Sequence, residues 1–112
     1  MAEVEVCEKC IDRFGKLGLY IGATEEYAKA GEFSMARMAN AFAYRLTKEM
    51  KNAGCISADS FSKAKSALNL IDMASKLRSF SGIEKGIKDF KELRQPISKE
   101  IIEFCRKAGV AV

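Results

Sequence analysis

The sequence predicts an all-α fold: a compact bundle of about five to six helices, mainly antiparallel, three of them long. Apolar residues recur at the 3.6-residue period of a helix almost throughout the chain. Serine precedes several of these stretches and glycine follows them, as at helix caps. No segment keeps the two-residue alternation of a β-strand for long. With 112 residues, the chain is expected to form one helical-bundle domain, 1–112, with its own core.

The first two long helices are expected at residues 4–21 and 35–52. The first has its apolar stripe at Cys7, Cys10, Ile11, Phe14, Leu17 and Ile21. Gly22 is expected to end it, and a short helix at 24–30 follows, ended by Gly31. In the second, Ser34 is a candidate N-cap and Gly54 a stop. Its stripe is Met35, Met38, Ala39, Phe42, Leu46 and Met50.

The third long helix is expected at 58–80, capped by Ser57, and apolar residues on two of its faces place it centrally. Two shorter helices follow at 83–94 and 98–108, with caps at Ser81 and Ser98. Pro96 is expected to separate them. Gly86 disfavours helix by about 1 kcal/mol relative to Ala, so the helix at 83–94 is predicted to be the most mobile.

Four cysteines, beginning with the motif CEKC at 7–10, leave three interpretations open. Cys7 and Cys10 share a helix face with apolar residues, which favours simple packing in the core. A disulfide or redox role, or a metal site, are the alternatives. The candidate metal ligands are Cys7, Cys10, Cys55 and Cys105. A second close ligand pair and any histidine are missing, so no cofactor is expected.

The chain is expected to be cytoplasmic. No apolar run approaches the ~18 residues of a membrane span, and the acidic start lacks the pattern of a signal peptide. Four cysteines without an export signal indicate a reduced compartment, with proteins of hyperthermophiles as the exception.

Catalysis is not expected. Without histidine the chain has no Ser–His or Cys–His pair and no imidazole general base. A glycine-rich phosphate loop is also missing, since GKLG at 15–18 lacks the required spacing.

Charge is distributed unevenly. Residues 1–34 carry four basic and seven acidic side chains, a net charge of −3, whereas residues 35–112 carry 15 basic and eight acidic ones, a net charge of +7. A basic body indicates a polyanionic partner, an acidic protein partner, or both. Tyr44 lies among the cations, where its ring can stack on a base. The candidate nucleic-acid-binding residues are Arg37, Tyr44, Arg45, Lys48, Lys51, Lys63, Lys65, Lys76 and Arg78.

Two apolar features indicate a protein partner instead. The stripe Ile83, Ile87, Phe90 and Leu93 either docks on the bundle or binds a partner. Methionines are adaptable at interfaces, and four of them lie on predicted helix faces: Met35, Met38, Met50 and Met73.

The stretches MANAFAYRLTKEMKNAG (38–54) and SALNLIDMASKLRSF (66–80) resemble the small α-helical subunits of archaeal CRISPR surveillance complexes, which act in antiviral defence. The resemblance implies a non-catalytic subunit that packs beside a large subunit and helps to hold nucleic acid. The sequence therefore favours a non-enzymatic, nucleic-acid-associated subunit of a larger complex. A helical protein-interaction or homodimerising adaptor is the alternative, and a small cysteine-based metal or redox protein the third reading.

Overall fold

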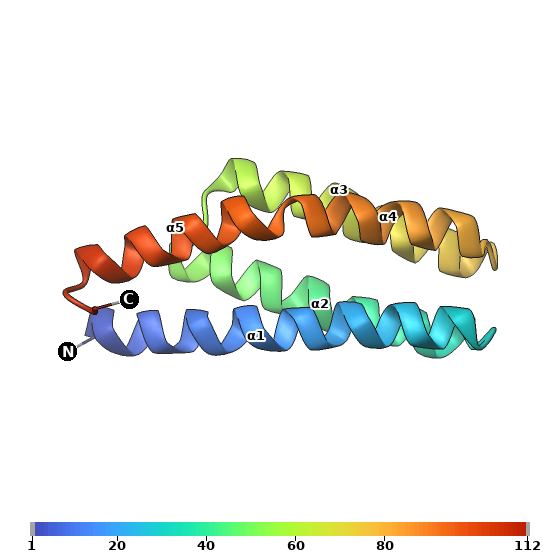
Figure 1. Cartoon of the computed structure of the whole chain (residues 1–112), viewed down its shortest axis with the longest axis horizontal. Helices are drawn as coiled ribbons and strands as arrows, with labels where there is room; N and C mark the ends of the chain where they lie inside the picture. Colours follow the sequence, from blue (N-terminus) through green and yellow to red (C-terminus); the bar gives the residue numbers. More distant parts are fainter. Residues whose placement is uncertain (1, 112) are drawn as a thin grey trace.

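Five α-helices make up nearly all of residues 2–111, the range that the computed structural model describes. They are α1 (Ala2–Lys29), α2 (Phe33–Ala53), α3 (Ala58–Lys76), α4 (Phe80–Glu92) and α5 (Arg94–Lys107) (Figure 1). This range holds no strand, so the predicted all-α class is confirmed. Only Leu93 separates α4 from α5, and the two continue as one bent rod, so the bundle has four rods. Counted in this way, the predicted five to six helices are slightly too many.

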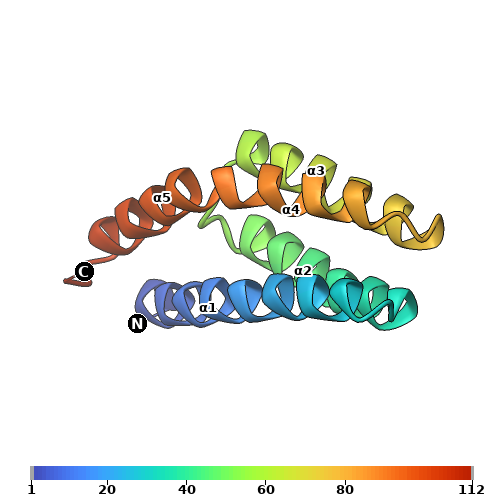
Figure 2. The same ribbon diagram turned by 45° about the vertical axis from the view of Figure 1, so that its right-hand side comes forward.

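The four rods pack in chain order. α1 and α2 form an antiparallel hairpin, α3 lies along α2, and α4 returns along α3 (Figures 1 and 2). α5 then bends toward the first turns of α1, so the two ends of the described chain lie at the same end of the bundle. The molecule measures 45 × 21 × 19 Å, its long dimension set by α1. None of the helices in residues 2–111 is both long enough and apolar enough to cross a membrane.

α1 continues through the predicted stop at Gly22, so the separate helix at 24–30 is wrong. The buried residues Ile21 and Thr24 flank Gly22 on the core side, and their packing carries the helix past the weak position. Gly22 itself faces open space. The chain reverses at Gly31, whose φ of +76° is a conformation that glycine adopts readily.

The turn between α3 and α4 comes earlier than predicted. α3 ends at Lys76 instead of residue 80, and Arg78 takes a left-handed φ of 55°. Ser79 then caps α4 by accepting a hydrogen bond from the Gly82 N–H, a role predicted for Ser81. The cap predicted at Ser57 is confirmed, because its hydroxyl oxygen accepts the Ser60 N–H at 3.1 Å.

Two other predicted helix starts are wrong. Ser34 lies inside α2, which begins after Glu32, and Ser98 lies inside α5. Pro96 occupies the first turn of α5 and does not separate the helices. A first-turn residue has no intrahelical N–H bond to lose, so proline is tolerated there.

The core face of α2 differs from the predicted methionine stripe. Ala36, Ala39 and Ala43 are buried there together with Met50, and small side chains let α2 approach its neighbours closely. Met35, Met38 and Phe42, expected in the core, lie on the surface with 40%, 55% and 39% of their area exposed.

Gly86 is the point of close approach between α4 and α3. A Cβ atom built at this position would lie 2.5 Å from Ile71 Cγ1 and 3.1 Å from the Ala67 carbonyl oxygen. The glycine therefore serves packing, and its position does not support the predicted mobility of this helix.

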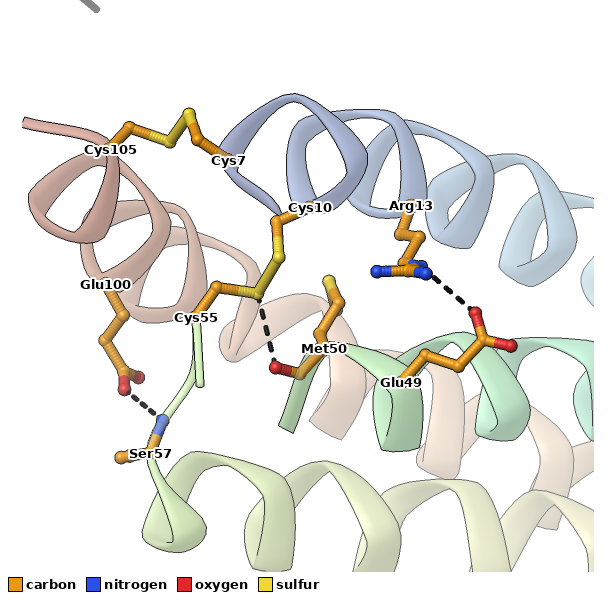
Figure 3. The surroundings of a disulfide bond; sticks show 9 residues. All are labelled: Cys7, Cys10, Arg13, Glu49, Met50, Cys55, Ser57, Glu100 and Cys105. Carbon is orange, nitrogen blue, oxygen red and sulfur yellow. Dashed lines mark hydrogen bonds and ion pairs between the residues drawn. A yellow bond between two sulfur atoms is a disulfide. The ribbon is translucent and has the colours of Figure 1, made fainter. Parts of the chain in front are cut away.

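Two disulfides lie at one end of the bundle (Figure 3). Cys7 of α1 pairs with Cys105 of α5, and Cys10 pairs with Cys55 in the turn between α2 and α3. All four cysteines are buried, as expected, but the favoured interpretation of unpaired packing is corrected. The two cysteines of CEKC do not bond to each other, because on one helix face they point toward different neighbouring elements.

A carboxylate reinforces this end. Glu100 of α5 accepts hydrogen bonds from the Ser57 N–H at 2.7 Å and from the Ser60 hydroxyl (Figure 3 shows the first). Partial burial alone would raise the pKa of Glu100, but these hydrogen bonds outweigh it and lower the pKa below its ordinary value of 4.5.

Candidate nucleic-acid interface

The side of the bundle between α2 and α3 carries most of the predicted cations. At one end, the Arg37 Nε–H donates to Asp72 Oδ1 at 2.9 Å, and Lys76 Nζ lies 3.5 Å from the other oxygen of the same carboxylate. One acid of α3 thus holds a cation from each helix. All three side chains are substantially exposed, so the cluster meets solvent directly.

An aromatic pair marks the other half of this side. Tyr44 of α2 packs at a tilt on Phe61 of α3, with ring centroids 6.3 Å apart. Lys51 Nζ lies 5.1 Å from the centre of the same Phe61 ring, in cation–π range. Tyr44 and Lys51 therefore lie on the side of α2 that faces α3.

Helical spacing adds two further lysines to the same side. Lys48 follows Tyr44 by four residues and precedes Lys51 by three, so it lies between them on the α2 surface. Lys65 follows Phe61 by four residues on α3. Both lysines are exposed. We call the resulting surface the basic groove, after the pocket that opens between its two helices; its residues are Arg37, Tyr44, Lys48, Lys51, Lys65, Lys76 and the acid Asp72.

The groove runs along the bundle and is strongly positive. From Arg37 to Lys51 it follows α2 for about 21 Å, at 1.5 Å per residue. Five cations against one carboxylate give it a formal charge of +4.

A pocket of about 210 Å³ opens midway along the basic groove. Its lining is Asn40, Ala41, Tyr44, Leu68, Asn69 and Asp72. The buried amide of Asn40 donates from Nδ2 to the Leu68 carbonyl oxygen at 2.9 Å, which fixes α2 against α3 beneath the pocket. Its Oδ1 has no hydrogen-bond partner within the described chain.

Asp72 stays ionised down to low pH. Partial burial would raise the pKa of its carboxyl, but the hydrogen bond from Arg37 and the charges of Arg37 and Lys76 prevail and lower it below the ordinary value of 3.8. The groove therefore keeps one fixed negative charge, which competes with any anionic ligand for two of its five cations.

Three of the nine predicted residues lie apart from the basic groove. Arg45 lies over the Phe42 ring, 5.4 Å from its centre, on the side of α2 that faces α1. Lys63 pairs with Asp59 one turn earlier on α3, at 3.2 Å. Arg78 belongs to the turn that leads into α4.

The predicted partner-binding stripe on α4 faces the core. Ile83, Ile87 and Phe90 are at most 2% exposed, and Leu93 is half-buried. This corrects the interpretation of the stripe as a surface for a partner, because docking on the bundle already buries it.

The candidate metal ligands are engaged in covalent bonds. With Cys7, Cys10, Cys55 and Cys105 in disulfides, none of the four offers a thiolate. In residues 2–111, no cluster of three or more potential ligand side chains exists.

Sequence reasoning missed the polar residues between the cations, namely Asn40, Asn69 and Asp72. The spacing of Asp72 from Lys65 and Lys76 was a readable signal, since steps of seven and four place all three on one helix face. The sequence does not show which face of α2 these three α3 residues would pack against.

Comparison of the chain with protein-family models, with curated proteins and with solved structures found no match.

Proposed function

We propose that this protein is a non-enzymatic nucleic-acid-binding subunit that contacts phosphates through the basic groove. One observation carries the proposal: two neighbouring helices contribute five cations to a single groove that holds one carboxylate. A polyanion replaces the counterions of such a surface and gains affinity as they are released.

The groove suits a single strand better than a duplex. Single-strand binders combine a positive groove along the backbone with aromatic side chains on which bases stack. Tyr44 is half-buried at the edge of a pocket of about 210 Å³, so its ring is held in place while one side of the site stays open. Lysines lie one turn from it along α2 and on the facing part of α3.

A salt titration of binding to single-stranded DNA and RNA tests the proposal. Contacts to three phosphates give a slope of about −2 in a plot of log K against log salt concentration. Replacing Lys48 and Lys65 by alanine removes two contacts, and the slope is expected to become shallower by about 1.4.

The control removes two lysines outside the groove. Lys63→Ala with Lys85→Ala takes away the same charge from side chains that already pair with Asp59 and Asp89. Absent or salt-independent binding by the wild type rejects the proposal, and so does a control variant that loses as much slope as the groove variant.

The resemblance to CRISPR small subunits extends the proposal to a role beside a large subunit. What supports this extension is the all-helical fold and the basic groove. Purification from the native host, with nuclease treatment as a control, should recover a large partner protein together with bound nucleic acid. Recovery of the chain alone after gentle lysis contradicts this extension.

The disulfides constrain where such a protein can meet nucleic acid. Disulfides persist in oxidising compartments and inside the cells of hyperthermophiles. A cytoplasmic nucleic-acid-binding protein with two buried disulfides therefore fits a hyperthermophilic host. Alkylation of free thiols in freshly lysed host cells tests this: the cytoplasmic protein should remain unlabelled.

A further inference from the structure

An apolar face lies on the outside of the α1–α2 hairpin. Within residues 2–111, seven large hydrophobic side chains are exposed, and four of them belong to this face: Leu19, Met35, Met38 and Phe42. Leu19 is 73% exposed and Met38 55%. We call this surface the hairpin face; its residues are Leu19, Tyr20, Ala23 and Tyr27 of α1 and Met35, Met38 and Phe42 of α2.

The hairpin face is continuous across the two helices. Tyr20 and Phe42 stack with ring centroids 5.3 Å apart and an interplanar angle of 20°. A hollow of about 190 Å³ opens beside them, lined by Tyr20, Ala23, Tyr27 and by the α2 residues of the face. Tyrosine, phenylalanine and methionine are the side chains enriched at protein interfaces, and methionine adapts to the shape of a partner.

Opposite charges stand at the two ends of the hairpin face. Glu32 lies at the turn end, where its N–H donates to the Tyr27 carbonyl oxygen at 2.9 Å. Arg45 lies at the other end, over the Phe42 ring. Both side chains are exposed, and neither forms an ion pair with another residue in the range 2–111. Arg45 follows Glu32 by thirteen positions, about 20 Å at the rise of a helix.

We infer that the hairpin face binds the same face of a second copy of this chain. A two-fold axis through the middle of the face turns it end for end, so that Arg45 of one copy meets Glu32 of the other, twice per dimer. This self-complementarity is what an isologous interface requires. A general partner protein has no reason to match a positive end and a negative end at this spacing.

The dimer is expected to be reversible. Two helices, each about 10 Å across, over a length of about 20 Å offer roughly 400 Å² per copy, about half of what a standard interface buries. Adjacent helix residues point about 100° apart, so Arg45 on the hairpin face and Tyr44 on the basic groove serve different sides of α2. The dimer therefore leaves both grooves open.

Sedimentation velocity over a wide dilution series, without nucleic acid, tests the inference. The wild type should shift from dimer to monomer as it is diluted. Met38→Glu places a charge in the middle of the face and should give monomers at every concentration. Met73→Glu on α3 is the matched control, because Met73 is 57% exposed but lies outside the face; it should dimerise like the wild type.

Charge reversal tests the end-for-end arrangement. Arg45→Glu alone and Glu32→Lys alone should each weaken the dimer, since each brings like charges together. The double variant should restore it. A strictly monomeric wild type, equal effects of Met38→Glu and Met73→Glu, or a double variant weaker than either single one overturns the inference. Far-ultraviolet circular dichroism of each variant shows that its helices remain intact.

Discussion

Arg37 and Asp72 join α2 to α3 through a hydrogen bond of 2.9 Å. Asp72 is the sole acid of the basic groove, and its carboxylate lies between two of the groove's cations, Arg37 and Lys76. An acid in this position lowers the affinity of the groove for a polyanion, while it positions the guanidinium and the ammonium group that a phosphate would meet.

Replacing Asp72 by asparagine should strengthen nucleic-acid binding. The amide removes one negative charge and releases Arg37 and Lys76, so the salt slope should steepen by up to about 1.4 if both then contact phosphates of a single strand. The exposed pair contributes at most about 1 kcal/mol to folding. Asp59→Asn is the control, because Asp59 pairs with Lys63 outside the groove. Weaker binding of the Asp72→Asn variant in fluorescence-anisotropy titrations would contradict the proposed site.

Removal of the Cys10–Cys55 disulfide should cost roughly 2–4 kcal/mol in free energy of unfolding. Its two cysteines lie 45 residues apart, and opening the loop returns entropy to the unfolded chain. The double variant Cys10→Ser with Cys55→Ser measures this loss in urea unfolding. A second variant, Cys7→Ser with Cys105→Ser, opens the longer loop of 98 residues and should lose at least as much.

Thiol counting gives an independent check on both pairings. Unfolded but unreduced wild-type protein should take up no alkylating reagent. Each double variant should also remain unlabelled until reductant is added, because its two remaining cysteines are still paired. Four labelled thiols in air-oxidised protein would contradict the pairing.

Gly86→Ala and Gly15→Ala should change stability in opposite directions. Both glycines lie within helices, where alanine is favoured by up to about 1 kcal/mol. Gly15 has open space around its Cβ position, so its alanine variant should be more stable. At Gly86 the methyl group would collide with Ile71, and overpacking of this kind typically costs about 1–3 kcal/mol. Thermal unfolding of the two variants measures the difference; a stabilised Gly86→Ala variant would show that α4 does not approach α3 as closely as described.

Acid should destabilise the fold through Glu100 and Asp72. Their pKa values in the folded protein lie below the ordinary values of 4.5 and 3.8. Each ionised carboxylate therefore contributes stability above its unfolded pKa, and this contribution is lost as the pH falls through the lower folded value. Urea unfolding between neutral and strongly acidic pH should show the decline.

The variant Glu100→Gln isolates the part of this acid response that comes from the Glu100 carboxylate of α5. Its stability should vary less with pH in the acid range than that of the wild type, because the amide does not titrate. Glu103→Gln, an exposed carboxyl on the same helix, is the control and should follow the wild type. Parallel curves for wild type and Glu100→Gln would show that the hydrogen bonds to Ser57 and Ser60 contribute nothing to the acid response.

By itself the sequence determined the helical class, the end of α2, the Ser57 cap and the glycine turn after α2. These features depend on interactions within about four residues, which periodicity and cap chemistry record directly. The same local signals failed at Gly22 and Ser81. There the burial of flanking residues and the geometry of the α3–α4 turn outweighed the preferences of the residues themselves.

Tertiary structure alone decided which surfaces meet. It turned Met35, Met38 and Phe42 outward and put alanines into the core, and it brought Asp72 to Arg37 from 35 positions away. It also chose the partners of Cys7 and Cys10 and gave Gly86 its contact with Ile71. The physical reason is common to all of these cases. The sequence of a helix shows which of its residues are apolar. The rotation of the helix about its axis, however, depends on the shapes of the helices packed against it, and those shapes are set by other parts of the chain.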